Sequence, residues 1–218
     1  MSTNILQEEL ARIRHDILVM ASRVEDDLGK AITALKKNDR DLAKEVKAGD
    51  AVVNALQLQI EDDAAILFAT QHPVAGDMRE LVTIFKITGN LERVGDYAVH
   101  LAKASRKLSK DPPFRSMEHI EKMAETGQEM LRASISAFLA RDTGAARKAA
   151  AMDNIIDAEH KILTEETLKL MKKRPGFVKK AVRLLNTSGY LERLGDHITN
   201  ICEGIIYMVD AKHEELND

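Results

Sequence analysis

The chain has 218 residues, of which 44% are hydrophobic and 31% charged, whereas only 4% are aromatic and tryptophan is absent. This composition suits a globular protein with a sizeable core, and its abundance of Ala, Leu, Ile, Glu and Lys favours long helices over strands. The 32 basic and 35 acidic residues leave a formal net charge of −3, and no long basic run occurs, which argues against nucleic-acid binding. We therefore expect an all-α fold.

The sequence also indicates where the protein works. A single cysteine, Cys202, cannot form a disulfide within the chain, and its apolar helical surroundings favour a small core residue. The N-terminal stretch carries Glu8 and Glu9 where a signal peptide needs basic and then apolar residues. No run reaches the roughly 18 apolar residues that a membrane span needs. We therefore expect a soluble, cytoplasmic protein.

Helix breakers divide the chain into six predicted helices. The four prolines, at positions 73, 112, 113 and 175, each disfavour a continuing helix. Asp39 and Asp142 can accept hydrogen bonds from the free N–H groups of a first turn and so mark two further helix starts. The predicted helices span residues 4–37, 39–70, 76–110, 116–140, 143–173 and 176–212.

A tandem duplication underlies this pattern. Residues 89–96, Gly-Asn-Leu-Glu-Arg-Val-Gly-Asp, recur at 189–196 as Gly-Tyr-Leu-Glu-Arg-Leu-Gly-Asp, with six of eight positions identical. Earlier landmarks, such as Met20 with Met123, match at an offset of 103, and a short indel before the third helix accounts for the difference. We therefore predict two three-helix repeats, at 1–110 and 116–218, joined by a linker at 111–115.

The repeated motif places two acids beside a core-facing stripe. In the third predicted helix Glu92 and Asp96 border apolar residues spaced three and four apart, and Glu192 and Asp196 do the same in the sixth. Glycines inside a helix, and like charges four residues apart, are each unfavourable locally. A motif of this kind that is present in both copies therefore points to a tertiary role.

Further polar pairs lie on the second predicted helix of each repeat. Asp50 pairs with Asn54 in the first repeat, and Asp153 pairs with Asp157, followed by His160, in the second. If these helices are antiparallel to the motif helices, the carboxylates meet, and a cation would relieve their repulsion. The predicted metal ligands are Asp153, Asp157, Glu192 and Asp196 in the second repeat and Asp50, Glu92 and Asp96 in the first.

The identity of such a cation stays open. Carboxylate oxygens suit Mg²⁺, Ca²⁺, Mn²⁺ or iron, and a neighbouring imidazole would favour zinc or iron. The alternative is that the acids are only solvated helix faces, which are common on helical surfaces. For Asp77, Arg79, Arg93 and Arg193 we weigh a partner-binding surface against simple solvated or ion-paired side chains.

Signatures of several enzyme classes are absent from the sequence. It contains no phosphate-binding Gly-rich loop ending in Lys-Ser/Thr, no Gly-x-Ser-x-Gly and no His-Glu-x-x-His. The nearest approach to the paired Glu-x-x-His of di-iron bundles is Asp157-Ala-Glu-His160, which occurs once. We expect a protein that is not an enzyme, with a metal-dependent enzyme or a metal-storage protein as alternatives.

With these motifs in place, the chain resembles the PhoU family of phosphate-signalling proteins over essentially its whole length. The resemblance rests on the Leu-Glu-Arg-x-Gly-Asp copies at 91–96 and 191–196, the turn from Pro73 to Arg79, and the acidic pairs of the second and fifth predicted helices. It implies a six-helix bundle, often dimeric, whose acidic motifs hold metal ions or multinuclear clusters.

The resemblance also implies a regulatory role. Family members act with the ATPase of the phosphate ABC transporter and with a sensor histidine kinase, limiting uptake and repressing the starvation response when phosphate is plentiful. Because Asn54 stands where a carboxylate would complete the first acidic pair, we expect the fuller metal site in the second repeat.

Overall fold

The computed structural model describes residues 2–108 and 114–216 and contains no strand in those ranges. The helices are α1 (Ser2–Lys37), α2 (Arg40–Gln71), α3 (Ala75–Leu108), α4 (Phe114–Ala140), α5 (Thr143–Ala150), α6 (Asp153–Lys173) and α7 (Val178–Asp210), with a short 3₁₀ turn at Pro175–Phe177 before α7. The predicted all-α fold is confirmed. Five of the six predicted helices appear with their ends shifted by only a few residues, apart from 109–110, which lie outside the described residues.

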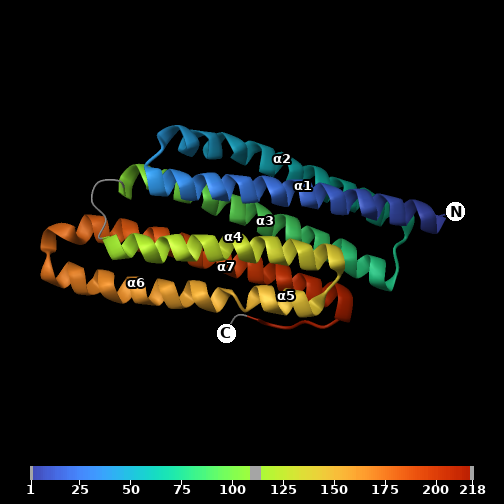
Figure 1. The fold of residues 1–218 in the computed structure, drawn as a ribbon. Coiled ribbons are helices and arrows are strands. Elements are labelled where there is room, and N and C mark those ends of the chain that lie inside the picture. Colours follow the sequence, from blue (N-terminus) through green and yellow to red (C-terminus); the bar gives the residue numbers. More distant parts are fainter. Residues whose placement is uncertain (1, 109–113, 217–218) are drawn as a thin grey trace.

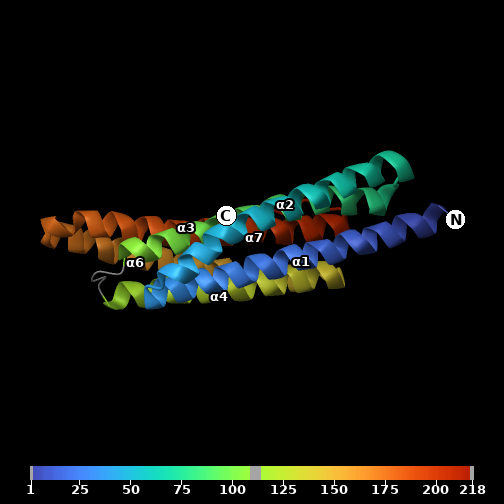
Figure 2. The ribbon, with the colours of Figure 1, turned by 90° about the horizontal axis from the view of Figure 1, so that it is seen from above.

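The helices form one elongated bundle whose members run roughly along a common axis (Figures 1 and 2). Helices α1, α2 and α3 pack against one another, and α4 packs with α6 and α7 in the same manner. The two halves meet mainly through α3 against α7, with a second contact between α1 and α4. The predicted linker at 111–115 falls largely outside the described residues, so the boundaries of the two repeats stay a prediction.

Equivalent caps begin the second helix of each half. The Asp39 side chain accepts hydrogen bonds from the N–H groups of Asp41 and Leu42, and the Asp142 side chain accepts one from Ala145. The residue before each cap has a left-handed backbone, with φ of 53° at Asn38 and 54° at Arg141. Both sequence-predicted helix starts are therefore correct.

The predicted helix 143–173 is not continuous. It divides at Ala151 and Met152 into α5 and α6, and the Met152 N–H bonds to the Ala149 carbonyl in a tightened turn. No proline or glycine marks this break, so the sequence pattern gives no sign of it. The break places Asp153 at the first turn of a new helix, where a carboxylate is favoured by the helix dipole.

The motif glycines allow close helix packing. A Cβ added at Gly95 would lie 3.4 Å from Val53 Cγ1, whereas one added at Gly195 would lie 2.0 Å from Asp153 Oδ1. The neighbouring motif leucines Leu91 and Leu191 are fully buried. The acidic positions of the motif are therefore held at the edge of the core, next to the second long helix of their own half.

A buried ion-pair cluster joins the halves at the other end of α3. Glu80 is 2% exposed and accepts hydrogen bonds from Arg14 of α1, at 2.5 Å, and from Arg141 after α4, at 2.7 Å. Burial raises the pKa of Glu80, but the bonds to the two guanidinium groups outweigh it and hold that pKa below its usual value. Among the described residues, no helix has the length and apolarity needed to span a membrane.

Candidate functional site

The acidic site of the second half is centred on Asp153. This side chain is 4% exposed, and the Thr199 hydroxyl donates to its Oδ2 across 3.4 Å. Its Oδ1 is buried and has no hydrogen-bond partner within the described parts of the chain. An unpartnered, buried carboxylate oxygen is costly to desolvate and is therefore a strong indication of a functional position.

Electrostatic coupling shows that the four predicted ligands of this half lie near one another. Burial, followed by the charges of Asp157, Asp196 and Glu192, raises the pKa of Asp153 to about 7. The pKa values of Glu192 and Asp196 are also raised, in each case first by burial and then by neighbouring acids. Neighbouring acids thus destabilise the charged forms of Asp153, Glu192 and Asp196.

An imidazole lies within the same electrostatic environment. His160 of α6 lowers the pKa of Glu192, against the larger effects of burial and Asp196. The Nδ1 atom of His160 is buried without a hydrogen-bond partner in the structure as described. The sequence placed His160 on the same stripe as Asp153 and Asp157, and the structure keeps it beside the acids.

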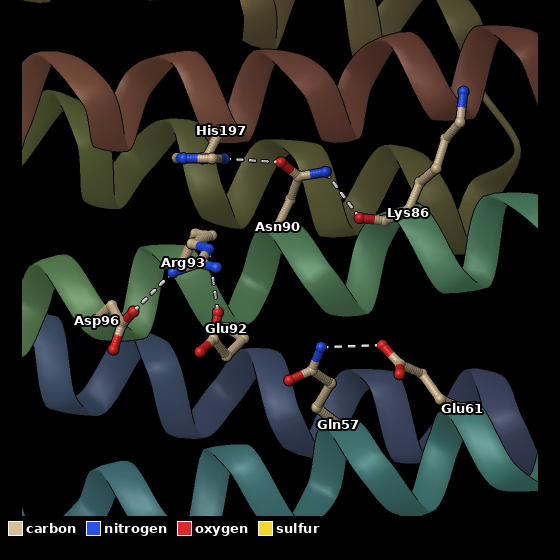
Figure 3. Close-up of polar contacts among 8 residues, drawn as sticks. All are labelled: Gln57, Glu61, Lys86, Asn90, Glu92, Arg93, Asp96 and His197. Carbon is tan, nitrogen blue, oxygen red and sulfur yellow. Dashed lines mark hydrogen bonds and ion pairs between the residues drawn. The ribbon is translucent and has the colours of Figure 1, made fainter.

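The acidic site of the first half contains a residue that the sequence analysis missed. Burial, followed by the charge of Asp96, raises the pKa of Glu92, and Asp50 and Glu61 add to the rise. Glu61 lies on α2 and accepts a hydrogen bond from Gln57 at 2.9 Å, as Figure 3 shows. Extending the three- and four-residue steps of α2 beyond Asp50 would have reached it.

Arg93 partly neutralises this first cluster. Its guanidinium lies 3.5 Å from a Glu92 oxygen and 3.3 Å from an Asp96 oxygen (Figure 3). With Glu61 present, the first acidic site has as many acids as the second, although Asn54 stands at the expected fourth position. The two sites differ in burial and neutralisation more than in their number of acids.

The donor chemistry of both sites fits a hard cation, since carboxylates dominate them and Asp153 has a free oxygen. The side chains as they stand do not complete a coordination sphere. In the described ranges, no three His, Cys, Asp or Glu side chains are grouped closely enough to hold a metal ion. Binding would therefore require side-chain rotation at the acids that border the core.

The four residues predicted to contact partners do not form one patch. Asp77 accepts a hydrogen bond from Gln7 at 3.0 Å, and Arg79 is half-buried. Arg93 and Arg193 are exposed, each beside the acidic site of its own half. The two arginines occupy equivalent places on α3 and α7, where Arg93 already pairs with Glu92 and Asp96.

Cys202 has the properties of a core residue. It is fully buried on α7, and burial raises the pKa of its thiol to about 12. A thiol with such a pKa is not a nucleophile at neutral pH. The interpretation of Cys202 as a small core residue is confirmed.

Comparison with known proteins adds a family likeness that covers both halves. A model of the PhoU domain matches the chain twice, at residues 17–105 and 120–205, in agreement with the predicted tandem repeat. A "Phosphate-specific transport system accessory protein PhoU homolog" from Clostridium acetobutylicum is 32% identical over 219 residues, with 100% of each chain covered. A homologue of the same description from Aquifex aeolicus is 32% identical and covers 98% of each chain.

Solved structures show the same architecture. The crystal structure of PhoU from Pseudomonas aeruginosa aligns with a TM-score of 0.90 and 28% identity, covering 94% of this chain and 99% of its own. The phosphate transport system regulatory protein PhoU from Streptococcus pneumoniae aligns equally well, with a TM-score of 0.90 and 28% identity over 96% of this chain.

Proposed function

Because this chain belongs to the PhoU family, we propose that it is a non-enzymatic, cytoplasmic regulator of phosphate homeostasis. The observation that carries the proposal is its end-to-end likeness to accessory proteins of the phosphate-specific transport system. In this role it acts as a negative regulator of phosphate uptake and of the phosphate-starvation response. Its partners are the ATPase subunit of the phosphate ABC transporter and a phosphate-sensing histidine kinase.

Several features of the chain support a role through protein contacts. The sequence lacks the nucleophile and phosphate-loop signatures of common enzymes, and the thiol of Cys202 is buried with a raised pKa. Exposed Arg93 and Arg193, at repeat-equivalent positions, offer bidentate hydrogen bonds of the kind that are often costly to remove at interfaces. Homodimerisation would present both arginines twice and would be measured by light scattering on the purified protein.

A deletion strain tests the regulatory role. In abundant phosphate, loss of this protein should leave a phosphate-starvation reporter expressed, because the restraint on the sensor kinase is gone. Arg193→Glu should derepress the reporter in part, whereas Lys161→Glu, an exposed control on α6, should leave it repressed. Normal repression in the deletion strain would exclude the proposal. Turnover of a substrate that Glu192→Gln abolishes would favour the alternative of a metal-dependent enzyme.

We further propose that the acidic sites bind a divalent metal ion or an iron or zinc cluster. The support is the unpartnered oxygen of buried Asp153 and the mutual proximity of its acidic neighbours. The second half should bind more tightly, because the first has Asn54 at the pair position and Arg93 already pairs with Glu92 and Asp96.

Elemental analysis and calorimetry on single variants test this ranking. Each variant removes one carboxylate from its own site. Because the second site is expected to hold most of the metal, Asp157→Asn should lower the metal content and the affinity more than Asp50→Asn does. Equal losses in the two variants would contradict the ranking. Metal loading without any effect of phosphate on the reporter would instead indicate a storage protein.

A further inference from the structure

A cavity of about 190 Å³ lies between α3 and α7 and is separate from the acidic sites. Its walls come from both halves of the chain, so it exists only because the two repeats are packed together. None of the predicted metal ligands lines it. Its polar lining residues are His100 and Lys103 from α3 and Arg183, Asn186, Thr187 and Tyr190 from α7.

The described lining of this cavity is positively charged, although the chain as a whole has a net charge of −3. Two cationic side chains, Lys103 and Arg183, line it, and none of its lining residues within the described ranges 2–108 and 114–216 is a carboxylate. The larger groove between α1 and α4, by contrast, has a balanced lining, with the acids Glu25, Asp26 and Glu125 beside the cations Lys30, Lys36 and Arg132. The two cations among the described lining residues therefore favour an anionic occupant.

A second cavity, of about 260 Å³, occupies the repeat-equivalent place. The offset of 100 residues that relates the two motifs also relates the linings of the two cavities. The pairs are His100 with Asn200, Lys103 with Glu203, Ala104 with Gly204, Asn186 with Lys86, and Tyr190 with Asn90. The duplication therefore made two copies of one cavity, and their chemistry then diverged.

A segment of the chain itself lies along the second cavity. The segment after α7 returns along it, contributing His213 and Glu214 to the lining, and the Leu216 N–H donates to Glu203 at 2.9 Å. An acidic side chain at this position thus receives a hydrogen-bond donor. Lys103 stands at the equivalent position of the first cavity, where the complementary occupant must supply an acceptor with negative charge.

The remaining polar groups of the lining differ in whether they already have a hydrogen-bond partner. His100 Nδ1 is buried without a hydrogen-bond partner in the described structure, and its ring stacks on Tyr190 at 4.8 Å. The Thr187 hydroxyl already donates to the Arg183 carbonyl, so it cannot donate the same proton to a ligand. The Arg183 guanidinium, the Lys103 ammonium and the neutral polar groups line one small cavity, a composition suited to a ligand with several acceptor oxygens.

We propose that this cavity binds the phosphate group of a small anion, either inorganic phosphate or a phosphorylated metabolite. A phosphate offers three or more acceptor oxygens to donors arriving from two helices, whereas a carboxylate offers only two. The stacked rings of His100 and Tyr190 form the flat wall of the site. This inference goes beyond the regulatory function and does not rest on it.

Calorimetric titration of the full-length, metal-free protein tests the site. Inorganic phosphate and adenosine monophosphate are the two probes, each at constant ionic strength in chloride with a chelator present, so that no bound metal supplies the affinity. At least one probe should saturate at one molecule per chain, and the preference between them identifies the source of the phosphate group. Lys103→Glu, which installs the residue of the equivalent cavity, should weaken binding at least about tenfold.

Matched variants separate the site from general charge effects. Arg183→Gln and the milder Lys103→Gln should also weaken binding, with thermal unfolding as the check that each variant folds. Lys86→Glu makes the same charge change in the equivalent cavity and should leave the affinity within about twofold. Failure of both probes to saturate at millimolar concentrations would overturn the proposal. Equal weakening by Lys103→Glu and Lys86→Glu would do so too.

Discussion

Two buried carboxylates in this protein have opposite electrostatic surroundings. Glu80 is 2% exposed and has two guanidinium groups as partners, and its pKa is lowered. Asp153 is 4% exposed and lies among other acids, and its pKa is raised to about 7. The first group stabilises the contact between the halves, whereas the second is held in place by the fold at a cost. Burial alone therefore does not distinguish a candidate functional acid from a structural one, whereas burial without a compensating cation does.

The largest effect is expected at Glu80. Glu80→Gln leaves Arg14 and Arg141 without their carboxylate and should lower the free energy of unfolding by about 3 kcal/mol at neutral pH. The folded-state pKa of Glu80 is lowered, so its stabilisation is present above the unfolded value near 4.5 and is lost as the pH falls through the folded value.

Urea unfolding across a pH series measures both parts of this expectation. The difference between wild type and Glu80→Gln should begin to shrink below the usual glutamate pKa, where the unfolded chain binds a proton that native Glu80 does not, and should vanish below the lowered native pKa. Glu129→Gln, an exposed change on α4, should alter stability by less than about 0.5 kcal/mol. A constant difference at every pH would exclude the ionic explanation.

Packing around Asp153 is tested by the motif glycines. Gly195→Ala should destabilise the protein by about 2 kcal/mol, because its Cβ would overlap the Asp153 carboxyl. Gly95→Ala, at the equivalent position of α3, should be close to neutral, since its Cβ meets Val53 at 3.4 Å. Thermal unfolding of both variants provides the comparison. Equal effects would show that Asp153 does not occupy the space next to α7.

The raised pKa of Asp153 predicts a stabilising substitution. In metal-free protein at pH 8, Asp153→Asn should raise the free energy of unfolding by about 1.5 kcal/mol, because a buried, unpaired charge is removed. Native Asp153 binds its proton more tightly than the unfolded chain does, so its contribution is present below the unfolded value of 3.8 and is lost as the pH rises to about 7.

Chemical unfolding at pH 5 and at pH 8 separates this effect from packing. The gain of Asp153→Asn over wild type should be larger at pH 8, and the exposed control Asp62→Asn should show no such difference. A gain that is independent of pH would mean that the amide packs better, with no contribution from charge.

The smallest effect is expected at the first acidic site. Arg93 is 58% exposed, so its pairs with Glu92 and Asp96 are screened by solvent. Arg93→Gln should therefore cost no more than about 0.5 kcal/mol, and less at high salt. Stability measurements at two salt concentrations test this. A large, salt-independent loss would place Arg93 with Glu80 among the structural ion pairs.

The sequence by itself determined the repeat, the helical class and most helix boundaries. The motifs at 89–96 and 189–196 revealed the duplication, and Asp39 and Asp142 marked helix starts because capping is a local interaction. The acidic residues Asp153 and Glu192 were also found from the sequence, Glu192 by its place beside the core stripe and Asp153 by its four-residue spacing from Asp157. These features depend on residues close together in the chain.

Only the tertiary structure decided the rest. The break between α5 and α6 has no local signal, and the packing of Asp153 against Gly195 of α7 joins residues far apart in the chain. The opposite environments of Glu80 and Asp153, and the cationic cavity lined by Lys103 and Arg183, arise where helices distant in sequence meet. Burial, repulsion and donor convergence are properties of neighbours in space, and no spacing along the chain specifies them.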